Sequence, residues 1–231
     1  MATPSSFETR DASLTVGADR VSALLVEPAH AWALYVLAHG AGAGMRHQFL
    51  DRIADALAER GIATFRYQFP YMEAGKSRTD SPAVAGATVR AAVAEAARLR
   101  PGLPLFAGGK SFGGRMTSTA AGESPLPGVG GLVFLGFPLH APGRPSIERA
   151  EHLDRISVPM LFLQGTRDEF AELGLIQQVT ARLGERATLR LIDGGNHSFE
   201  VPKKTGQTRD TVMAHLAVTI AGWAQGELDV F

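Results

Sequence analysis

The sequence predicts an α/β fold in which helices cover both faces of an eight-stranded, mostly parallel, doubly wound sheet. Two strand-like segments at residues 11–16 and 20–27, separated by a short turn at Gly17, predict an antiparallel hairpin. Six apolar strand-like segments follow, and helical patterns alternate with them, as is typical of βαβ units. Neither an internal repeat nor a low-complexity linker divides the 231 residues. We therefore expect a single domain over residues 11–231, preceded by an N-terminal tail of residues 1–10.

Each of the six later strands is a short apolar run bounded by turn residues. They are expected at residues 33–38, 63–67, 103–107, 131–137, 160–164 and 187–192. The run at 33–38 is almost continuously apolar, which is typical of a strand buried on both faces. A sheet with such strands needs helices above and below it.

Apolar residues at helical spacing predict the covering helices. They are expected at residues 47–60, 81–99, 169–183 and 208–223, with a weaker one near 146–154. In the first, Ile53 and Leu57 share one face and Gly61 ends the helix. In the second, Ser81 and Pro82 have the residue types of an N-cap and a first helical position.

The composition excludes several classes of function. The chain has 23 basic and 23 acidic residues, so no net charge favours nucleic acid or an anionic membrane. It has no cysteine, which excludes disulfides, cysteine metal ligands and a thiol nucleophile. The first ten residues lack the features of a signal peptide, and no apolar run has the length of a membrane span. We expect a cytoplasmic protein that binds neither nucleic acid nor membrane; the oligomeric state stays open.

Ser111 is the candidate nucleophile. It lies in the segment Gly109-Lys110-Ser111-Phe112-Gly113, after an apolar strand and before a helix-compatible stretch. This Gly-x-Ser-x-Gly context is typical of a nucleophile elbow, a sharp strand-to-helix turn that exposes the hydroxyl above the sheet edge. The strained backbone of such a turn requires small residues on either side. Because a chain with 26 glycines can contain the pattern by chance, the interpretation also depends on partners further along the chain.

An acid and a histidine follow in the required order. Asp168 comes after the strand at 160–164, and His197 comes after the strand at 187–192, in a Gly-rich loop. The order Ser, Asp, His is that of α/β hydrolases, whose chemistry lies at the carboxyl ends of the strands. His197 is the expected general base because it is the only histidine that follows the last strand. Glu169 and Asp193 remain alternative acids, although Asp168 matches the expected turn.

The chain resembles the α/β-hydrolase superfamily, and within it the dienelactone-hydrolase-like group. The resemblance covers nearly the whole chain and rests on residues 39–45, 65–71, 109–113 and 196–199. Dienelactone hydrolases use a Cys nucleophile, which this chain lacks, so the resemblance implies the α/β-hydrolase fold but not that substrate. Residues 139–158, where relatives insert a lid, leave room for one short helix at most. We therefore expect no lid domain.

The segment His39–Gly44 follows the strand at 33–38 and matches the oxyanion loop of α/β hydrolases. A tetrahedral intermediate needs two preorganised backbone donors. The Phe112 N–H, directly after the nucleophile, is one, and the resemblance implies Ala41 N–H as the other. The alternative is a dinucleotide-binding loop, since Gly40-x-Gly42 lies between a strand and a helix. Its third glycine is replaced by Met45 and its usual acid by Arg66, an exchange that suits only a 2′-phosphate.

Four further residues are candidates for substrate binding: Lys110, Arg66, Tyr67 and His140. Lys110 is either a rim side chain paired with an acid or an anchor for a substrate carboxylate, and the first arrangement is the commoner for lysine. Arg66, with Lys203 and Lys204, would add positive charge at the same mouth. Tyr67 would line the pocket wall or pack the loop, and His140 follows the sixth strand.

The sequence thus predicts a serine hydrolase that cleaves small acyl esters or thioesters with Ser111, His197 and Asp168, without metal or organic cofactor. The acyl and leaving groups stay open. The alternative is a non-catalytic binding or scaffold protein, because a fold alone does not establish a function.

Overall fold

Eight strands form one mixed sheet in the order β1-β2-β4-β3-β5-β6-β7-β8, as seen in a computed structural model that describes residues 7–229. The strands are β1 (Phe7–Val16), β2 (Asp19–Pro28), β3 (Ala33–Ala38), β4 (Ile62–Tyr67), β5 (Leu105–Lys110), β6 (Val129–Leu135), β7 (Met160–Gly165) and β8 (Ala187–Ile192). The β1–β2 and β2–β4 pairs are antiparallel. The pairs from β4 to β8 are parallel, which confirms the predicted sheet.

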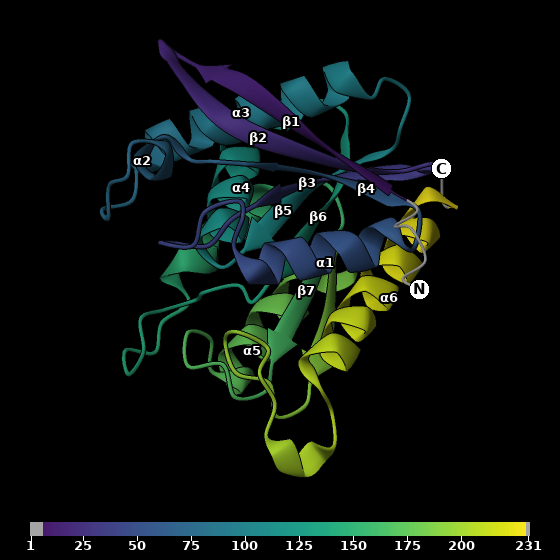
Figure 1. The fold of residues 1–231 in the computed structure, drawn as a ribbon. Helices are drawn as coiled ribbons and strands as arrows, with labels where there is room; N and C mark the ends of the chain where they lie inside the picture. Colours follow the sequence, from purple (N-terminus) through teal and green to yellow (C-terminus); the bar gives the residue numbers. More distant parts are fainter. Residues whose placement is uncertain (1–6, 230–231) are drawn as a thin grey trace.

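Helices cover both faces of the sheet (Figure 1). The main helices are α1 (Gln48–Ala58), α3 (Pro82–Leu99), α4 (Phe112–Glu123), α5 (Leu173–Leu183) and α6 (Arg209–Leu228), and α2 (Pro70–Glu73) is a single turn. The helices α1 and α6 pack side by side over one apolar core, and α3, α4 and α5 enclose the larger core on the other face. The sheet is therefore doubly wound, as the sequence predicts. None of the described helices is long and apolar enough to cross a bilayer.

Several boundaries differ from the prediction. Strand β1 begins at Phe7, where it pairs with Pro28, so residues 7–10 of the expected tail belong to the sheet; residues 1–6 lie outside the described part. Residues 8–11 are exposed along this edge strand, and without a buried face they carry no strand periodicity. Helix α5 begins at Leu173 rather than 169, because residues 169–171 complete the turn around Asp168.

The connection between β6 and β7 holds no inserted domain. In residues 136–159 the structure has one helical element, the 3₁₀ helix η1 (Glu148–Arg155), where the sequence predicts a weak helix. Its buried residues Ala150 and Leu153 pack into the core beside α4 and α5. The carboxyl ends of the central strands are consequently left without a lid.

Two glycines allow the backbones of β5 and α4 to contact the backbone at the end of β3 directly. A Cβ at Gly109, where φ is +154°, would lie 2.3 Å from the Ala38 carbonyl oxygen, and a Cβ at Gly113 would lie 2.5 Å from that of His39. Real Cβ atoms do not approach oxygen so closely. The packing therefore requires glycine on both sides of Ser111, as the elbow interpretation predicts.

Replacing Gly113 by alanine tests this close packing. We expect Gly113→Ala to lower the free energy of unfolding by about 1–3 kcal/mol or more, because the β3 end must move to admit the methyl group. Gly222→Ala in α6 is a matched control, since nothing lies within 4 Å of its added Cβ; that exchange should raise the free energy of unfolding by up to about 1 kcal/mol. Urea denaturation measures both, and equal effects would contradict the packing argument.

Candidate active site

Ser111 sits at the turn from β5 into α4 with a strained backbone. Its φ is +50° and its ψ is −115°, and among the described non-glycine residues only Phe199 shares a positive φ. Such a conformation costs about 1–3 kcal/mol and persists only where the surroundings enforce it. Here the Ser111 N–H donates to the Leu135 carbonyl oxygen of β6 at 3.1 Å. The turn lifts the hydroxyl above the carboxyl end of the sheet.

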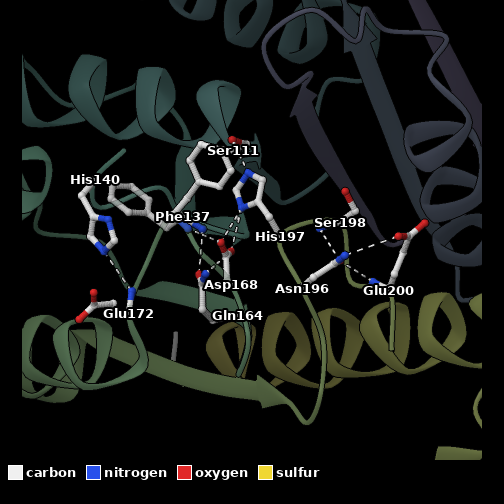
Figure 2. Close-up of polar contacts among 11 residues, drawn as sticks. Ser111, Phe137, His140, Gln164, Asp168, Glu172, Asn196, His197, Ser198 and Glu200 are labelled. Atoms are coloured by element: carbon white, nitrogen blue, oxygen red, sulfur yellow. Dashed lines mark hydrogen bonds and ion pairs between the residues drawn. The ribbon is translucent and has the colours of Figure 1, made fainter. Parts of the chain in front are cut away.

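The structure brings Ser111, His197 and Asp168 into one hydrogen-bonded chain, which Figure 2 shows. His197 Nε2 lies 2.8 Å from Ser111 Oγ. On its other side, His197 Nδ1 lies 2.8 Å from Asp168 Oδ2 and 2.9 Å from Oδ1. With the carboxylate as acceptor, Nδ1 carries the proton and Nε2 is free to accept the serine proton. This is the arrangement by which serine hydrolases activate a hydroxyl.

Asp168 is buried, and two groups besides His197 donate to its carboxylate. The Gln164 side-chain amide donates to Oδ2 at 2.5 Å, and the Phe170 N–H donates to Oδ1 at 2.8 Å. Gln164 in turn accepts the Phe137 N–H at 2.9 Å, which ties the acid to the end of β6. The sequence analysis did not identify Gln164, although a single amide side chain at the end of the otherwise apolar strand β7 indicates a buried polar contact.

The two alternative acids lie elsewhere. Glu169 and Asp193 are both exposed, and Asp193 is within 3.4 Å of the Thr166 hydroxyl rather than of His197. The geometry therefore favours Asp168.

The loop of His197 is locked against the turn of Asp168. Gly165 and Gly195 pass so closely that a Cβ on Gly165 would lie 2.2 Å from the Gly195 carbonyl oxygen. The Arg167 N–H donates to that same oxygen at 2.8 Å. Beyond it, the Asn196 side chain accepts the Ser198 and Glu200 N–H groups at 2.9 Å (Figure 2). The imidazole is thus held by backbone contacts as well as by its acid.

The segment His39–Gly44 runs along the opposite side of Ser111. Neither Ala41 N–H nor Phe112 N–H donates to an acceptor within residues 7–229, and Ala41 lines the cavity that contains Ser111. Both amides are therefore available to an oxyanion. Burial lowers the pKa of His39 to about 4, so its ring is neutral and Nε2 accepts the Phe69 N–H at 3.1 Å.

Residues 66–71 support this loop from beside it. The Gln68 side chain accepts the Met45 N–H at 2.9 Å, and the Tyr71 hydroxyl accepts the Gly42 N–H at 3.1 Å. The Arg66 guanidinium donates to the Met45 carbonyl oxygen at 3.0 Å. The sequence left open whether this segment lines the pocket wall or packs the loop; the contacts of Arg66, Gln68 and Tyr71 support the second role.

Three expected substrate-binding residues do not reach the cavity. Arg66 is 3% exposed and pairs with Asp51 of α1, because its side chain lies on the sheet face that α1 covers; it is likewise not free for a 2′-phosphate. Tyr67 is buried and packs its ring 5.4 Å from that of Phe69. His140 accepts the Glu172 N–H at 3.1 Å and braces the turn after Asp168 (Figure 2).

A cavity of about 530 Å³ opens beside Ser111 and His197. The His39 loop, the His197 loop and α1 supply most of its wall. The ring centre of Phe170 lies 4.3 Å from that of His197. Arg52 and Arg209 stand at its edge, but they pair with Asp210 and Glu200. A second hollow of about 490 Å³ lies between the β1–β2 hairpin and residues 43–46, away from Ser111. Within residues 7–229, no group of three or more His, Cys, Asp or Glu side chains is placed to hold a metal ion.

Lys110 fits neither interpretation made from the sequence. It lines the cavity, yet its Nζ is fully buried and has no hydrogen-bond partner among the described residues. The ammonium lies 5.9 Å from the Phe49 ring centre and 5.6 Å from that of Phe199. It is neither a rim side chain paired with an acid nor an anchor that a substrate in the cavity can touch. Lys203 and Lys204 lie in the exposed 3₁₀ helix η3 (Lys203–Thr205) and do not line the cavity.

Comparison with solved structures gives the same fold along nearly the whole chain. A dienelactone hydrolase from Anabaena variabilis is 19% identical with a TM-score of 0.76, and the match covers 96% of this chain and 98% of that one. A serine hydrolase without a lid from Xanthomonas campestris is 18% identical with a TM-score of 0.69, covering 96% and 94%. A cold-adapted esterase from an Arctic intertidal metagenomic library is also 18% identical with a TM-score of 0.69, covering 96% of both chains.

Residues 31–225 match the family described as "Alpha/beta hydrolase domain". That span runs from β3 to α6 and includes Ser111, Asp168, His197 and both loops beside them. The chain therefore belongs to the α/β-hydrolase domain family.

Proposed function

We propose that the chain is a serine hydrolase that cleaves small carboxylic esters or thioesters through an acyl-enzyme. The observation that carries the proposal is the unbroken hydrogen-bonded chain from Ser111 Oγ through His197 to Asp168. Two amides without acceptors beside it, those of Ala41 and Phe112, supply the second element that acyl transfer needs. Membership of the family and its esterase-like structural neighbours agree with this chemistry.

In the proposed reaction, Ser111 Oγ attacks the acyl carbon while His197 Nε2 takes the serine proton. Asp168 holds the imidazole in the Nδ1-protonated form and stabilises the imidazolium that results. The Ala41 and Phe112 N–H groups donate to the oxyanion. His197 then passes the proton to the leaving group, and a water molecule activated by the same ring releases the acid.

The competing proposal is a binding or scaffold protein that keeps the fold without the reaction. The strained backbone of Ser111 favours the enzyme, because strain of about 1–3 kcal/mol collects at functional sites and here accompanies a hydroxyl placed 2.8 Å from His197 Nε2. Measured ester hydrolysis that depends on Ser111 separates the two proposals.

The absence of a lid suggests the size of the substrate. The cavity of about 530 Å³ is open, and the link from β6 to β7 offers no segment to cover a long acyl chain. A long chain gains about 0.8 kcal/mol per methylene only where apolar surface encloses it. We therefore propose short acyl groups.

The first test is the replacement of Ser111. We expect Ser111→Ala to fold normally and to lose at least about 10³-fold in kcat on a short p-nitrophenyl ester, since the attacking oxygen is gone. Ser198→Ala, which removes a second serine hydroxyl at the cavity wall, is the matched control and should retain activity. Retention of activity by purified Ser111→Ala would rule out Ser111 as the nucleophile.

The second test concerns the acid. An asparagine at position 168 favours the wrong imidazole tautomer, so Asp168→Asn should lower kcat by up to about 10⁴-fold while the fold persists. Asp193→Asn should stay near the parent activity because its carboxylate is exposed and contacts the Thr166 hydroxyl rather than the imidazole. If the two variants exchanged these behaviours, the acid would have to be reassigned.

The third test concerns chain length and charge. Acetyl and butyryl esters should give the highest kcat/KM, and decanoyl esters should gain nothing. A hemisuccinyl ester should have no advantage, because the Lys110 ammonium is inaccessible and Arg66 is paired with Asp51; the sequence left this point open. An optimum at the decanoyl ester would contradict the open site. A clear preference for the hemisuccinyl ester would indicate that Lys110 contacts the substrate.

A further inference from the structure

The ammonium of Lys110 lies behind the Ser111–His197–Asp168 chain rather than in the cavity. Lys110 is the last residue of β5 and directly precedes Ser111, and its side-chain Cγ packs against Gly40. Its Nζ reaches inward to the side of the Phe49 and Phe199 rings, which stack on each other with centres 5.9 Å apart. Two aromatic rings give a cation some stabilisation, but no protein acceptor among residues 7–229 replaces the lost water.

The surroundings of Gly136 show which atoms lie near Lys110 Nζ. A Cβ on Gly136, where φ is +70°, would lie 3.1 Å from Lys110 Nζ, 3.4 Å from the His197 carbonyl oxygen and 3.5 Å from Asp168 Oδ2. The three atoms therefore surround one small space that exists because residue 136 has no side chain. The ammonium and the carboxylate face each other across it without a direct ion pair, and His197 contributes its main-chain carbonyl oxygen; its imidazole contacts the same carboxylate at 2.8 Å.

Asp168 is the charged group that acts on Lys110 from this enclosure. The pKa of Lys110 falls to about 8 because burial disfavours the charged amine, although Asp168 opposes the fall. The other charged or titratable groups around the cavity are His47 at the N-cap of α1, Arg52 within α1, Glu200 of the histidine loop and Arg209 of α6. They are partly or fully exposed to solvent, and both arginines are paired.

We propose that Lys110 is a positioning residue whose charge, acting through Asp168, opposes the imidazolium form of His197, so that loss of this charge at alkaline pH speeds the reaction. This inference rests on the proposed serine hydrolase function. In this proposal Lys110 helps to set the pH range of activity and does not bind substrate.

The physical reason lies in the attack step. As the Ser111 Oγ–H bond breaks and the bond from Oγ to the acyl carbon forms, the proton moves to His197 Nε2 and the ring becomes positive. The Asp168 carboxylate stabilises that charge. A protonated Lys110 beside the same carboxylate cancels part of its potential, at an effective dielectric constant of about 20. Once Lys110 has released its proton to bulk water, the carboxylate acts on the imidazolium unopposed.

The test compares pH profiles of kcat for a short p-nitrophenyl ester from pH 6 to 10. The parent should rise by about 3- to 10-fold between pH 7 and 9, a change that corresponds to a pKa effect of up to about one unit. Lys110→Met, whose side chain has similar length and no charge, should keep only the rise that comes from deprotonation of His197 and then reach a plateau, without the further rise of the parent. Lys110→Gln is a second neutral variant, and Lys203→Met is the control for loss of an exposed lysine.

A merely structural role for Lys110 would give a different result. It would lower kcat of both neutral variants by a constant factor and leave the shape of the profile unchanged, and that outcome would overturn the proposal. A further rise beyond that of His197 that persists in both variants would overturn it equally.

An independent measurement needs no substrate. The imidazole signal of His197, assigned by its loss in His197→Gln, can be titrated by NMR in the parent and in Lys110→Met. Its midpoint should move to higher pH when the neighbouring cation is absent, and an unchanged midpoint would contradict the proposal. If the parent hydrolyses no ester, the proposed function fails, while this titration still decides whether Lys110 acts on His197.

Discussion

The close approach of the β5–α4 turn to the end of β3 is the constraint on which the site depends. Gly109 and Gly113 bring the backbone around Ser111 against the Ala38 and His39 carbonyl groups, and no larger residue fits there. The same contact sets Ser111 at a positive φ and places it beside the loop that begins at His39. The proposed nucleophile and oxyanion donors are therefore positioned by one close contact between neighbouring parallel strands rather than by separate loops.

Polar groups on the flanking strands hold the rest of the site in place. Asp168 receives donors from His197, Gln164 and Phe170, so a buried carboxylate stays satisfied and its direction is fixed. On the other side, the side chains of Gln68 and Tyr71 accept the amides of the His39 loop. Both halves are thus built before substrate arrives, which is the condition for stabilising charge without reorganisation during the reaction.

The sequence predicts the sheet, the helices and the meeting of Ser111, Asp168 and His197, because strand order and glycine spacing follow from local patterns. It does not predict contacts that depend on which face of a strand a side chain takes. Arg66 illustrates this: it follows the right strand, but α1 covers its face and Asp51 pairs with it. Gln164 was missed for the same reason, and the burial of Lys110 Nζ depends on Phe49 and Phe199, which come from distant parts of the chain.

The central claim is that Ser111 is activated by His197, and covalent trapping tests it most directly. A fluorophosphonate ester should modify the parent at one position, and peptide mapping should find the added mass on the segment Gly109–Arg115 at Ser111. The rate of trapping should fall sharply in His197→Gln, because the free hydroxyl is a weak nucleophile without its base. Modification at another serine, or trapping of Ser111 at an undiminished rate in His197→Gln, would contradict the account.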